Sequence, residues 1–279
     1  MNYFLGIDIG GTTIKAVLMR DLRDTRPRGF SIDTPRNKKE FLSALHWLVE
    51  SMLGKSDFPR KSDFQNFQKS DLQGIGVGLP GIIDSQREVL LRARNLPFLN
   101  GWKPKEFFKK FSALVKIEND VNCFILAEHT RGAAKGYKNV VGIAIGTGIG
   151  GGIIIGGKLY RGSHGAAGEV GHTTLGIMNP ELGIMKEYEF EELGAKEAFK
   201  KLGDRSEIIG IGVANLIHIF DPDIVVLGGG GITSGGIKLG VVQKIAQKHI
   251  ISPLKKTPIV KGALGEYAQA IGAALLFEK

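Results

Sequence analysis

Ile7-Asp8-Ile9-Gly10-Gly11-Thr12-Thr13-Ile14, near the start of the chain, predicts two strands joined by a turn that can face a phosphate group. Residues 2–9 have the pattern of a buried strand, and residues 14–19 have that of the strand returning from the turn. A turn with little side-chain bulk lets backbone N–H groups point at a ligand, and a threonine hydroxyl adds a donor. One such turn alone is more often a plain hairpin turn, because glycine is the default residue there.

A related pattern recurs in the second half of the chain. Residues 140–145 and 150–155 are expected strands, with Gly146-Thr147-Gly148 as the turn between them. A third glycine cluster, residues 228–231, follows a short buried strand at 224–227. The repeated turns favour phosphate binding over plain hairpins, although the sequence has neither a P-loop nor a Rossmann fingerprint.

Strand patterns alternate with helix patterns along the rest of the chain. Six segments have the composition or the apolar period of helices: 38–53, 121–134, 190–202, 206–220, 237–249 and 265–277. Further strands are expected at 26–34, 74–79 and 114–118, whereas 55–71 is polar and is expected to be a loop or an insertion. This alternation predicts an α/β protein.

The composition is that of an ordinary globular protein, with 23% charged and 43% hydrophobic residues. The single cysteine, Cys123, excludes an intrachain disulfide and a cluster of cysteine metal ligands, which fits a reducing, cytoplasmic setting. No basic segment precedes an apolar stretch at the start, so we expect no signal peptide. The uncharged stretch 140–157 has 18 residues, but eight of them are glycine, so we expect no membrane span.

The chain is basic, with a net charge of +9. Between residues 86 and 116, basic side chains outnumber acidic ones eight to two. Such a balance is also found on nucleic-acid surfaces. A solvated basic face, or one that attracts an anionic substrate such as ATP, is favoured here, because charge sets nonspecific affinity rather than function. We therefore expect no nucleic-acid partner.

Several polar side chains stand where strands end or apolar runs are interrupted. Asp8 lies within an apolar strand, where a buried carboxylate needs a partner; it can position Mg²⁺ near a phosphate or serve a structural hydrogen bond. Asn119 or Asp120 can cap the helix that follows, yet an aspartate at a strand end can also accept the proton of a substrate hydroxyl. Glu169 and His172, three residues apart, would share a helical face and could hold a polyol or a metal.

The ordered set of motifs resembles the ROK branch of the sugar kinase, hsp70 and actin superfamily over nearly the whole chain. Residues 7–12 are similar to the first phosphate loop of that superfamily. The other matching motifs are, in chain order, Gly78-Leu79-Pro80-Gly81-Ile82-Ile83-Asp84, Asn95-Leu96-Pro97 with Gly101-Trp102, Glu118-Asn119-Asp120-Val121-Asn122, and residues 146–152, 165–172, 224–230 and 263–274.

The resemblance implies a two-lobed, actin-like ATPase (ribonuclease H-like) fold with a cleft for nucleotide and sugar between the lobes. The first lobe would comprise residues 1–119 and the C-terminal helix 265–279, and the second would comprise residues 120–264. The resemblance also implies a homodimer.

The activity implied by the resemblance is that of an ATP- and Mg²⁺-dependent hexose kinase of glucokinase type. Asp120 would be the general base that takes the proton of the sugar C6 hydroxyl. The other sugar hydroxyls would be held by Asn95, Asn119, Glu169 and His172. Phosphates and Mg²⁺ would be held by Asp8 (through water or phosphate), Gly10, Gly11, Thr12, Thr147 and Gly148, and the adenosine would approach the backbone at Gly229 and Gly230.

One segment departs from the family pattern. The family usually continues the Gly-His pair with a zinc loop, C-x-C-G-x-x-G-C-L-E, whereas no cysteine follows Gly171-His172 in this chain. His172 alone cannot make a tetrahedral site, so we expect no structural zinc. Counting back five residues from Gly194 favours Glu189 as the sugar-binding glutamate of this segment, with Glu187 as the alternative.

Glucose is the favoured substrate, and fructose, mannose or an N-acetylated amino sugar are alternatives. A non-catalytic module that senses sugar or nucleotide is an alternative of another class. Family regulators carry a helix-turn-helix domain before the first phosphate loop, and here that loop starts at residue 7, so we expect no DNA-binding domain. Asp120 together with both phosphate loops favours the kinase.

Overall fold

The computed structural model describes residues 2–24, 27–54, 69–84, 86, 88–112, 114–179, 184–196 and 204–278. The chain forms two compact units: unit 1 is Met1–Ala127 with Tyr267–Lys279, and unit 2 is Glu128–Glu266. Helix α3 (Asp120–Arg131) begins in unit 1 and ends in unit 2. The boundary expected from the sequence, between residues 119 and 120, lies at the start of this helix, eight residues before the division between the two units.

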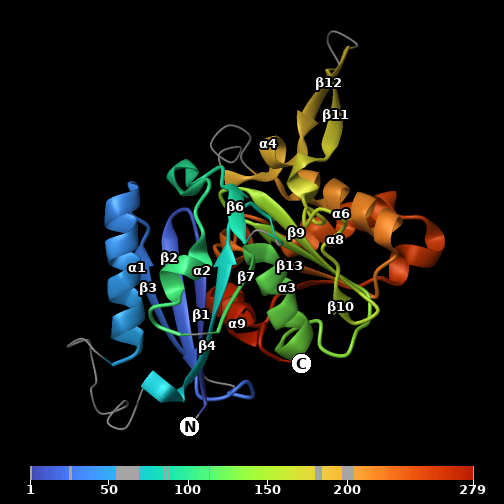
Figure 1. Ribbon diagram of the computed structural model, residues 1–279. Helices are drawn as coiled ribbons and strands as arrows, with labels where there is room; N and C mark the ends of the chain where they lie inside the picture. The colour runs from blue at the N-terminus through green and yellow to red at the C-terminus, as the bar shows by residue number, and fades with distance from the viewer. Residues whose placement is uncertain are drawn as a thin grey trace. The chain divides into compact units, whose positions relative to one another are not determined.

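Unit 1 contains a five-stranded mixed sheet with the strand order β3-β2-β1-β4-β7 (Figure 1). Its strands are β1 (Tyr3–Ile9), β2 (Thr13–Met19), β3 (Arg28–Asp33), β4 (Leu72–Leu79) and β7 (Val115–Asn119). The first three strands pair antiparallel, whereas β1, β4 and β7 run parallel. The carboxyl ends of β1, β4 and β7 therefore lie at one edge of the sheet, which is where α/β proteins commonly bind ligands.

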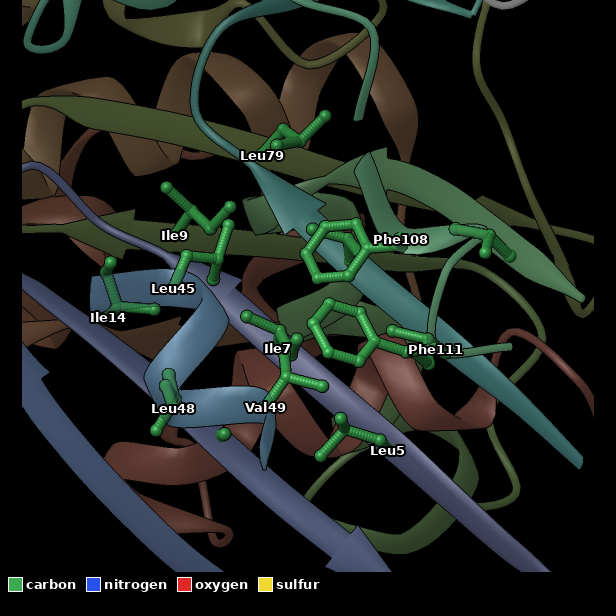
Figure 2. Close-up of a cluster of buried hydrophobic side chains, with 14 of the residues drawn as sticks. Leu5, Ile7, Ile9, Ile14, Leu45, Leu48, Val49, Leu79, Phe108 and Phe111 are labelled. Carbon is green, nitrogen blue, oxygen red and sulfur yellow. The ribbon is translucent and has the colours of Figure 1, made fainter. Parts of the chain in front are cut away.

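One face of this sheet is covered by α1 (Lys38–Met52) and α2 (Pro104–Phe108). Because strand side chains alternate between faces, Leu5, Ile7 and Ile9 of β1 all enter this core. Figure 2 shows them packed against Leu45, Leu48 and Val49 of α1 and against Phe108 and Phe111. The residue between, Asp8, points to the opposite face of the sheet.

The opposite face of the unit 1 sheet packs against α9 (Ala268–Leu275). The approach is so close that a Cβ added at Gly6 or Gly76 would overlap a backbone carbonyl oxygen of α9. The expected helix 265–277 begins as a 3₁₀ turn at Gly265–Tyr267 and becomes α-helical at Ala268. A separate two-stranded sheet in unit 1, β5 (Ile82–Asp84) with β6 (Val89–Arg92), was not predicted from the sequence.

Unit 2 repeats the sheet of unit 1, with the order β10-β9-β8-β13-β14. Its strands are β8 (Val140–Ile145), β9 (Ile149–Ile155), β10 (Lys158–Leu159), β13 (Ile224–Gly228) and β14 (Ile259–Lys261). Again the first three strands in chain order pair antiparallel, and β8, β13 and β14 run parallel. The repeat predicted from the two Gly/Thr turns is confirmed, and it extends to the whole sheet.

Helices of unit 2 are α4 (Phe190–Gly194), α6 (Ser206–Phe220), α7 (Gly230–Thr233) and α8 (Leu239–His249). A core formed by α4, α6, α8 and one face of the sheet contains Phe190, Ile209, Val213 and Val242. The expected helix 190–202 begins at Phe190 as predicted, but α4 ends at Gly194. Residues 197–203 and most of the expected loop 55–71 lie outside the described residues.

The segment that follows His172 is a β-hairpin, formed by β11 (Thr174–Asn179) and β12 (Ile184–Glu189). Its pairing starts with Thr174 opposite Glu189, directly after His172. In Figure 1 the hairpin extends away from the remainder of unit 2. Shorter 3₁₀ turns lie at Lys69–Asp71, Pro97–Leu99, Val170–His172 and Ser252–Lys256. Within the part of the chain that is described, no helix is both long and apolar enough to cross a membrane.

Candidate functional site

The first Gly/Thr turn follows β1 at the edge where the parallel strands end. Gly10 N donates to Thr13 O at 3.0 Å, which closes the turn. Thr34 holds the turn from β3: its hydroxyl donates to Gly10 O at 2.7 Å, and its N–H donates to Thr12 O at 2.9 Å. Sequence reasoning did not single out Thr34, because no local pattern links it to a turn more than twenty residues earlier.

Asn95 lies against the same turn. A Cβ added at Gly11 would come within 2.9 Å of Asn95 Cβ, so Gly11 is needed for this approach. Arg36 is a second neighbour that the sequence did not reveal, since its Nη1 donates to Gly11 O at 3.3 Å. The structure thus brings together Gly10, Gly11 and Asn95, which the sequence placed in one site.

Asp8 is a buried carboxyl group, with 7% of its surface exposed. Burial is the main cause that raises the pKa of Asp8 to about 8; the charge of Asp120 raises it further, and Lys15 opposes the shift. Asp8 pairs in register with Gly78 of β4. A Cβ at Gly78 would lie 3.5 Å from Asp120 Cα, so Gly78 packs beside the start of α3.

Asp120 is the first residue of α3, at the end of β7. Of the two residues proposed as the helix cap, Asn119 supplies it: its Oδ1 accepts from Val121 N at 2.9 Å and from Asn122 N at 3.1 Å. Asn119 Nδ2 also donates to Gly81 O at 3.2 Å, which ties β7 to the turn after β4. An Asp120 oxygen accepts from Val121 N at 2.9 Å. The cap positions Asp120 at the same edge as Asp8 and the first turn.

The second Gly/Thr turn, in unit 2, is also fixed by hydrogen bonds within the chain. Gly146 N donates to Gly148 O at 2.8 Å, and Lys196 N donates to Gly146 O at 3.0 Å. Ile149 N, directly after the turn, donates to Glu191 Oε2 at 2.8 Å. Thr147 is exposed at its tip. Glu191 is a neighbour that sequence reasoning did not identify.

Glu169, His172 and Glu189 form one cluster in unit 2. His172 Nδ1 lies 3.1 Å from Glu189 Oε2, and His172 Nε2 lies 3.9 Å from Glu169 Oε2. The pKa of Glu169 is raised chiefly by burial, while His172 lowers it and Glu191 raises it. The three-residue spacing therefore brings Glu169 and His172 together, although on a 3₁₀ turn.

Glu189 and Glu187 differ in where the hairpin places them. Glu189 is the last residue of β12 and the N-cap of α4, where it forms a capping box with Glu192. Glu187 is exposed on the hairpin, opposite Gly176. Of the two candidates, Glu189 is the one that contacts His172.

Gly229 and Gly230 follow β13 at the start of α7. Gly229 has φ of 83°, and a Cβ there would overlap the backbone of Ile145, so packing within the chain requires glycine. At Gly230, a Cβ would meet none of the described atoms within 4 Å. Internal packing does not explain glycine at 230, whereas approach of a ligand to the backbone would.

The donor groups suit a cation that is shared with phosphates rather than one enclosed by protein. Among the described residues, no group of three or more His, Cys, Asp or Glu side chains is placed to hold a metal ion. Mg²⁺ usually takes one or two carboxylates and completes its shell with water and substrate phosphates. Asp8, a buried carboxyl group beside a glycine turn, fits that role.

Comparisons with known proteins agree on one family. A family profile described as "ROK family" matches residues 4–189 and 181–279. An N-acetyl-D-glucosamine kinase of Aliivibrio salmonicida is 30% identical, with 98% of this chain and 99% of that protein aligned.

Solved structures of the same family are similar to this chain over nearly its whole length. A ROK family glucokinase from Streptomyces griseus, in complex with glucose and AMPPNP, has a TM-score of 0.80 and 25% identity over 99% of each chain. A ROK hexokinase from Thermus thermophilus has a TM-score of 0.74 and 28% identity over 98% of this chain and 97% of the other.

Proposed function

The chain belongs to the ROK family and has its actin-like ATPase fold, and we propose that it is an ATP-dependent hexose kinase acting on the C6 hydroxyl of glucose. The observation that carries the proposal is the placement of Asp120. The Asn119 cap sets it at the start of α3, at the edge where Asp8 and the first Gly/Thr turn also lie. A proton acceptor beside a phosphate turn and a candidate Mg²⁺ ligand is what phosphoryl transfer requires.

Asp120 acts as the general base. One carboxylate oxygen accepts the proton of the C6 hydroxyl while the sugar oxygen bonds to the γ-phosphorus. The bond between that phosphorus and the β–γ bridging oxygen breaks, and ADP leaves with the electron pair. Phosphoryl transfer depends mainly on alignment and charge neutralisation, so the protein's task is to hold both reactants in place.

Asp8 and the glycine turns hold the nucleotide phosphates. Asp8 would hold Mg²⁺ directly, through water, or through a phosphate, and the ion would supply neutralisation of the charge that develops on the phosphates. Gly10 closes the first turn, and the backbone N–H groups of Gly11 and Thr12 in unit 1, and of Thr147 and Gly148 in unit 2, face the phosphate oxygens. Gly229 and Gly230 admit the adenosine close to the backbone.

The remaining polar residues orient the sugar. Asn95 and Asn119 in unit 1, and Glu169, His172 and Glu189 in unit 2, bind its hydroxyl groups. A carboxylate can only accept, so the contact with Glu189 fixes the proton of His172 on Nδ1. His172 Nε2 is then the ring nitrogen that meets a sugar hydroxyl.

An N-acetylated hexose is the second candidate substrate, because the Aliivibrio salmonicida relative is named for N-acetyl-D-glucosamine. Mannose and fructose are further hexoses of the same class. We also propose that the protein is a cytoplasmic homodimer, on the basis of the family resemblance. Light scattering coupled to size-exclusion chromatography measures the dimer directly.

The test is ADP release from MgATP with a sugar panel: glucose, mannose, fructose, allose, N-acetylglucosamine, N-acetylmannosamine and no sugar. Asp120→Asn is measured beside the wild type, with Glu106→Gln as control, because Glu106 is an exposed acid of α2 in the same unit. We expect turnover with one or two sugars, a fall of roughly 10²–10⁴-fold in Asp120→Asn, and wild-type rates in Glu106→Gln. Phosphorus NMR of the product identifies the phosphorylated carbon.

The outcomes separate the candidate functions. Glucose 6-phosphate as the main product supports the proposal, and turnover of an N-acetylated hexose alone assigns the second candidate. If no sugar raises ADP release above the sugar-free rate, the kinase proposal is wrong. Sugar or nucleotide binding without turnover would then identify a non-catalytic sensing module.

A further inference from the structure

Glu191 lies beside the second Gly/Thr turn on a helix whose start is fixed. Glu189 caps α4 through its capping box with Glu192, and Phe190 is fully buried in the core. This register directs the next side chain, Glu191, to β9, where Oε2 accepts the Ile149 N–H at 2.8 Å. The carboxylate therefore binds the backbone at the point where the turn becomes strand.

Two glycines of the candidate site leave the space that Glu191 fills. A Cβ at Gly148 would overlap Glu191 Oε2, and a Cβ at Gly171 would lie 3.3 Å from Glu191 Cβ. Any larger residue at position 148 would have to displace the carboxylate. Glycine at 148 thus leaves room for the Glu191 carboxylate beside the turn.

Glu191 also acts on the cluster that we assign to the sugar. Its charge raises the pKa of Glu169, after the larger effect of burial, so the two carboxyl groups lie near each other. Gly171, which packs against Glu191, lies between Glu169 and His172 in the sequence. One side chain therefore touches the turn on one side and the Glu169–His172 segment on the other.

We infer that Glu191 is a positioning residue that holds the 146–149 turn in the shape that binds nucleotide phosphates and fixes it against the Glu169–His172 segment. The inference rests on the proposed function, because it takes this turn to bind phosphates. A carboxylate near a phosphate is unfavourable unless a donor engages it, and the Ile149 N–H does so. Glu191 thus acts through the backbone and does not itself bind the nucleotide.

The test combines a readout of the hydrogen bond with a readout of binding. Hydrogen exchange of the Ile149 amide is followed by NMR in the full chain, and the affinity for MgATP without sugar is measured by calorimetry. The variants are Glu191→Ala and Glu191→Gln, with Glu207→Gln as control, because Glu207 is an exposed acid of α6 in the same unit. Melting temperatures are recorded for all of them.

In Glu191→Ala, we expect the Ile149 amide to exchange at least roughly tenfold faster and MgATP to bind about tenfold more weakly, or ~1.4 kcal/mol. Glu191→Gln keeps the shape and one acceptor oxygen, so its effect on both readouts should be smaller. Glu207→Gln should match the wild type. A loss of affinity in Glu191→Gln at an unchanged melting temperature separates positioning from unfolding.

Two results would overturn the inference in distinguishable ways. If the wild type and both Glu191 variants bind MgATP equally, Glu191 does not position the turn, and the proposed kinase function is untouched. If the wild type binds no MgATP at all, the proposed function is wrong, and the inference is wrong with it.

Discussion

The carboxyl group of Asp8, on β1, lies within electrostatic reach of Asp120, at the start of α3. Gly78 of β4 stands in register with Asp8, and a Cβ at Gly78 would lie 3.5 Å from Asp120 Cα, so β4 links the two residues. Burial and a like charge act in the same direction on Asp8, so it keeps its proton up to about pH 8. A ligand that brings positive charge to this edge would release that proton.

Asp120→Asn should lower the pKa of Asp8, because it removes the charge that opposes ionisation of Asp8. The pKa should stay well above that of an ordinary aspartate, since burial is the larger cause. Carboxyl ¹³C NMR titration of Asp8 in the two proteins measures the difference without any activity assay. Glu106→Gln should leave the titration as it is. An Asp8 titration that is identical in Asp120→Asn would contradict the pairing of these two carboxyl groups.

Asp8 should also make the protein less stable as the pH rises. The folded chain holds the Asp8 proton to about pH 8, whereas an unfolded aspartate releases it near pH ~3.9. The folded state therefore binds more protons than the unfolded state between these two pH values. The contribution of Asp8 to stability is fully present below pH ~4 and is lost as the pH rises to 8, by at most about 1.4 kcal/mol per pH unit. Urea unfolding between pH 4.5 and 8.5 measures the slope.

Asp8→Asn tests the source of that slope, since asparagine resembles the protonated acid. Its free energy of unfolding should vary less with pH and should exceed that of the wild type near pH 8. Asp33→Asn, at an exposed acid of β3, is the matched control and should keep the wild-type slope. Equal slopes in the wild type and Asp8→Asn would rule out Asp8 as the titrating group.

The residues that sequence reasoning found are those whose chemistry is local. The Gly/Thr turns, the Asn119 cap and the Glu169–His172 spacing are each visible within a few residues, and the structure forms each of them. The two turns predicted the repeated hairpins, and the structure extends the repeat to the whole five-stranded sheet. Asp8 was conspicuous because a charge interrupted an apolar strand.

The residues that were missed act over long sequence separations. Glu191 meets Ile149 across 42 positions, and Thr34 meets Gly10 across 24, so no periodicity could pair them. The β11–β12 hairpin had a local signal that was not used. Asn179-Pro180 and Gly183 are turn-forming residue types between two apolar runs.

Purified protein should contain no stoichiometric zinc. The chain has one cysteine, and the segment after His172 is held by hairpin pairing and by the contact between His172 and Glu189. Elemental analysis should therefore find far less than one zinc per chain, and a chelator should leave the melting temperature unchanged. Zinc at one equivalent, or a large drop in melting temperature with chelator, would show that a metal site forms by another route.

Gly76→Ala should destabilise unit 1, because the new Cβ would overlap the carbonyl oxygen of Ala273 in α9. Overpacking of this kind typically costs about 1–3 kcal/mol, and backbone is less able to move than a side chain. Gly240→Ala is the opposite case. Gly240 lies on α8, and a Cβ added there would have no described atom within 4 Å. Alanine is more favourable than glycine in a helix by up to ~1 kcal/mol. Chemical denaturation should show that the free energy of unfolding falls in Gly76→Ala and rises in Gly240→Ala. Equal effects would mean that α9 does not pack closely on β4.

Glu128→Gln should destabilise unit 2. Glu128, fully buried on α3, accepts three backbone N–H groups: Ala133 N at 2.8 Å, Ala263 N at 3.0 Å and Leu264 N at 3.0 Å. These bonds tie the end of α3 to the segment that leads to α9. Glutamine has one acceptor oxygen, and its NH₂ group would face an N–H donor, so about 3 kcal/mol of stability should be lost.

Urea unfolding of Glu128→Gln beside Glu207→Gln separates this effect from the mere loss of one negative charge, since Glu207 is exposed. Hydrogen exchange at Ala263 and Leu264 adds a local readout, and both amides should exchange faster in Glu128→Gln only. A Glu128→Gln variant as stable as Glu207→Gln, with both amides still protected, would mean that the amide side chain can reproduce all three bonds. The carboxylate charge would then have no part in joining α3 to the 263–264 segment.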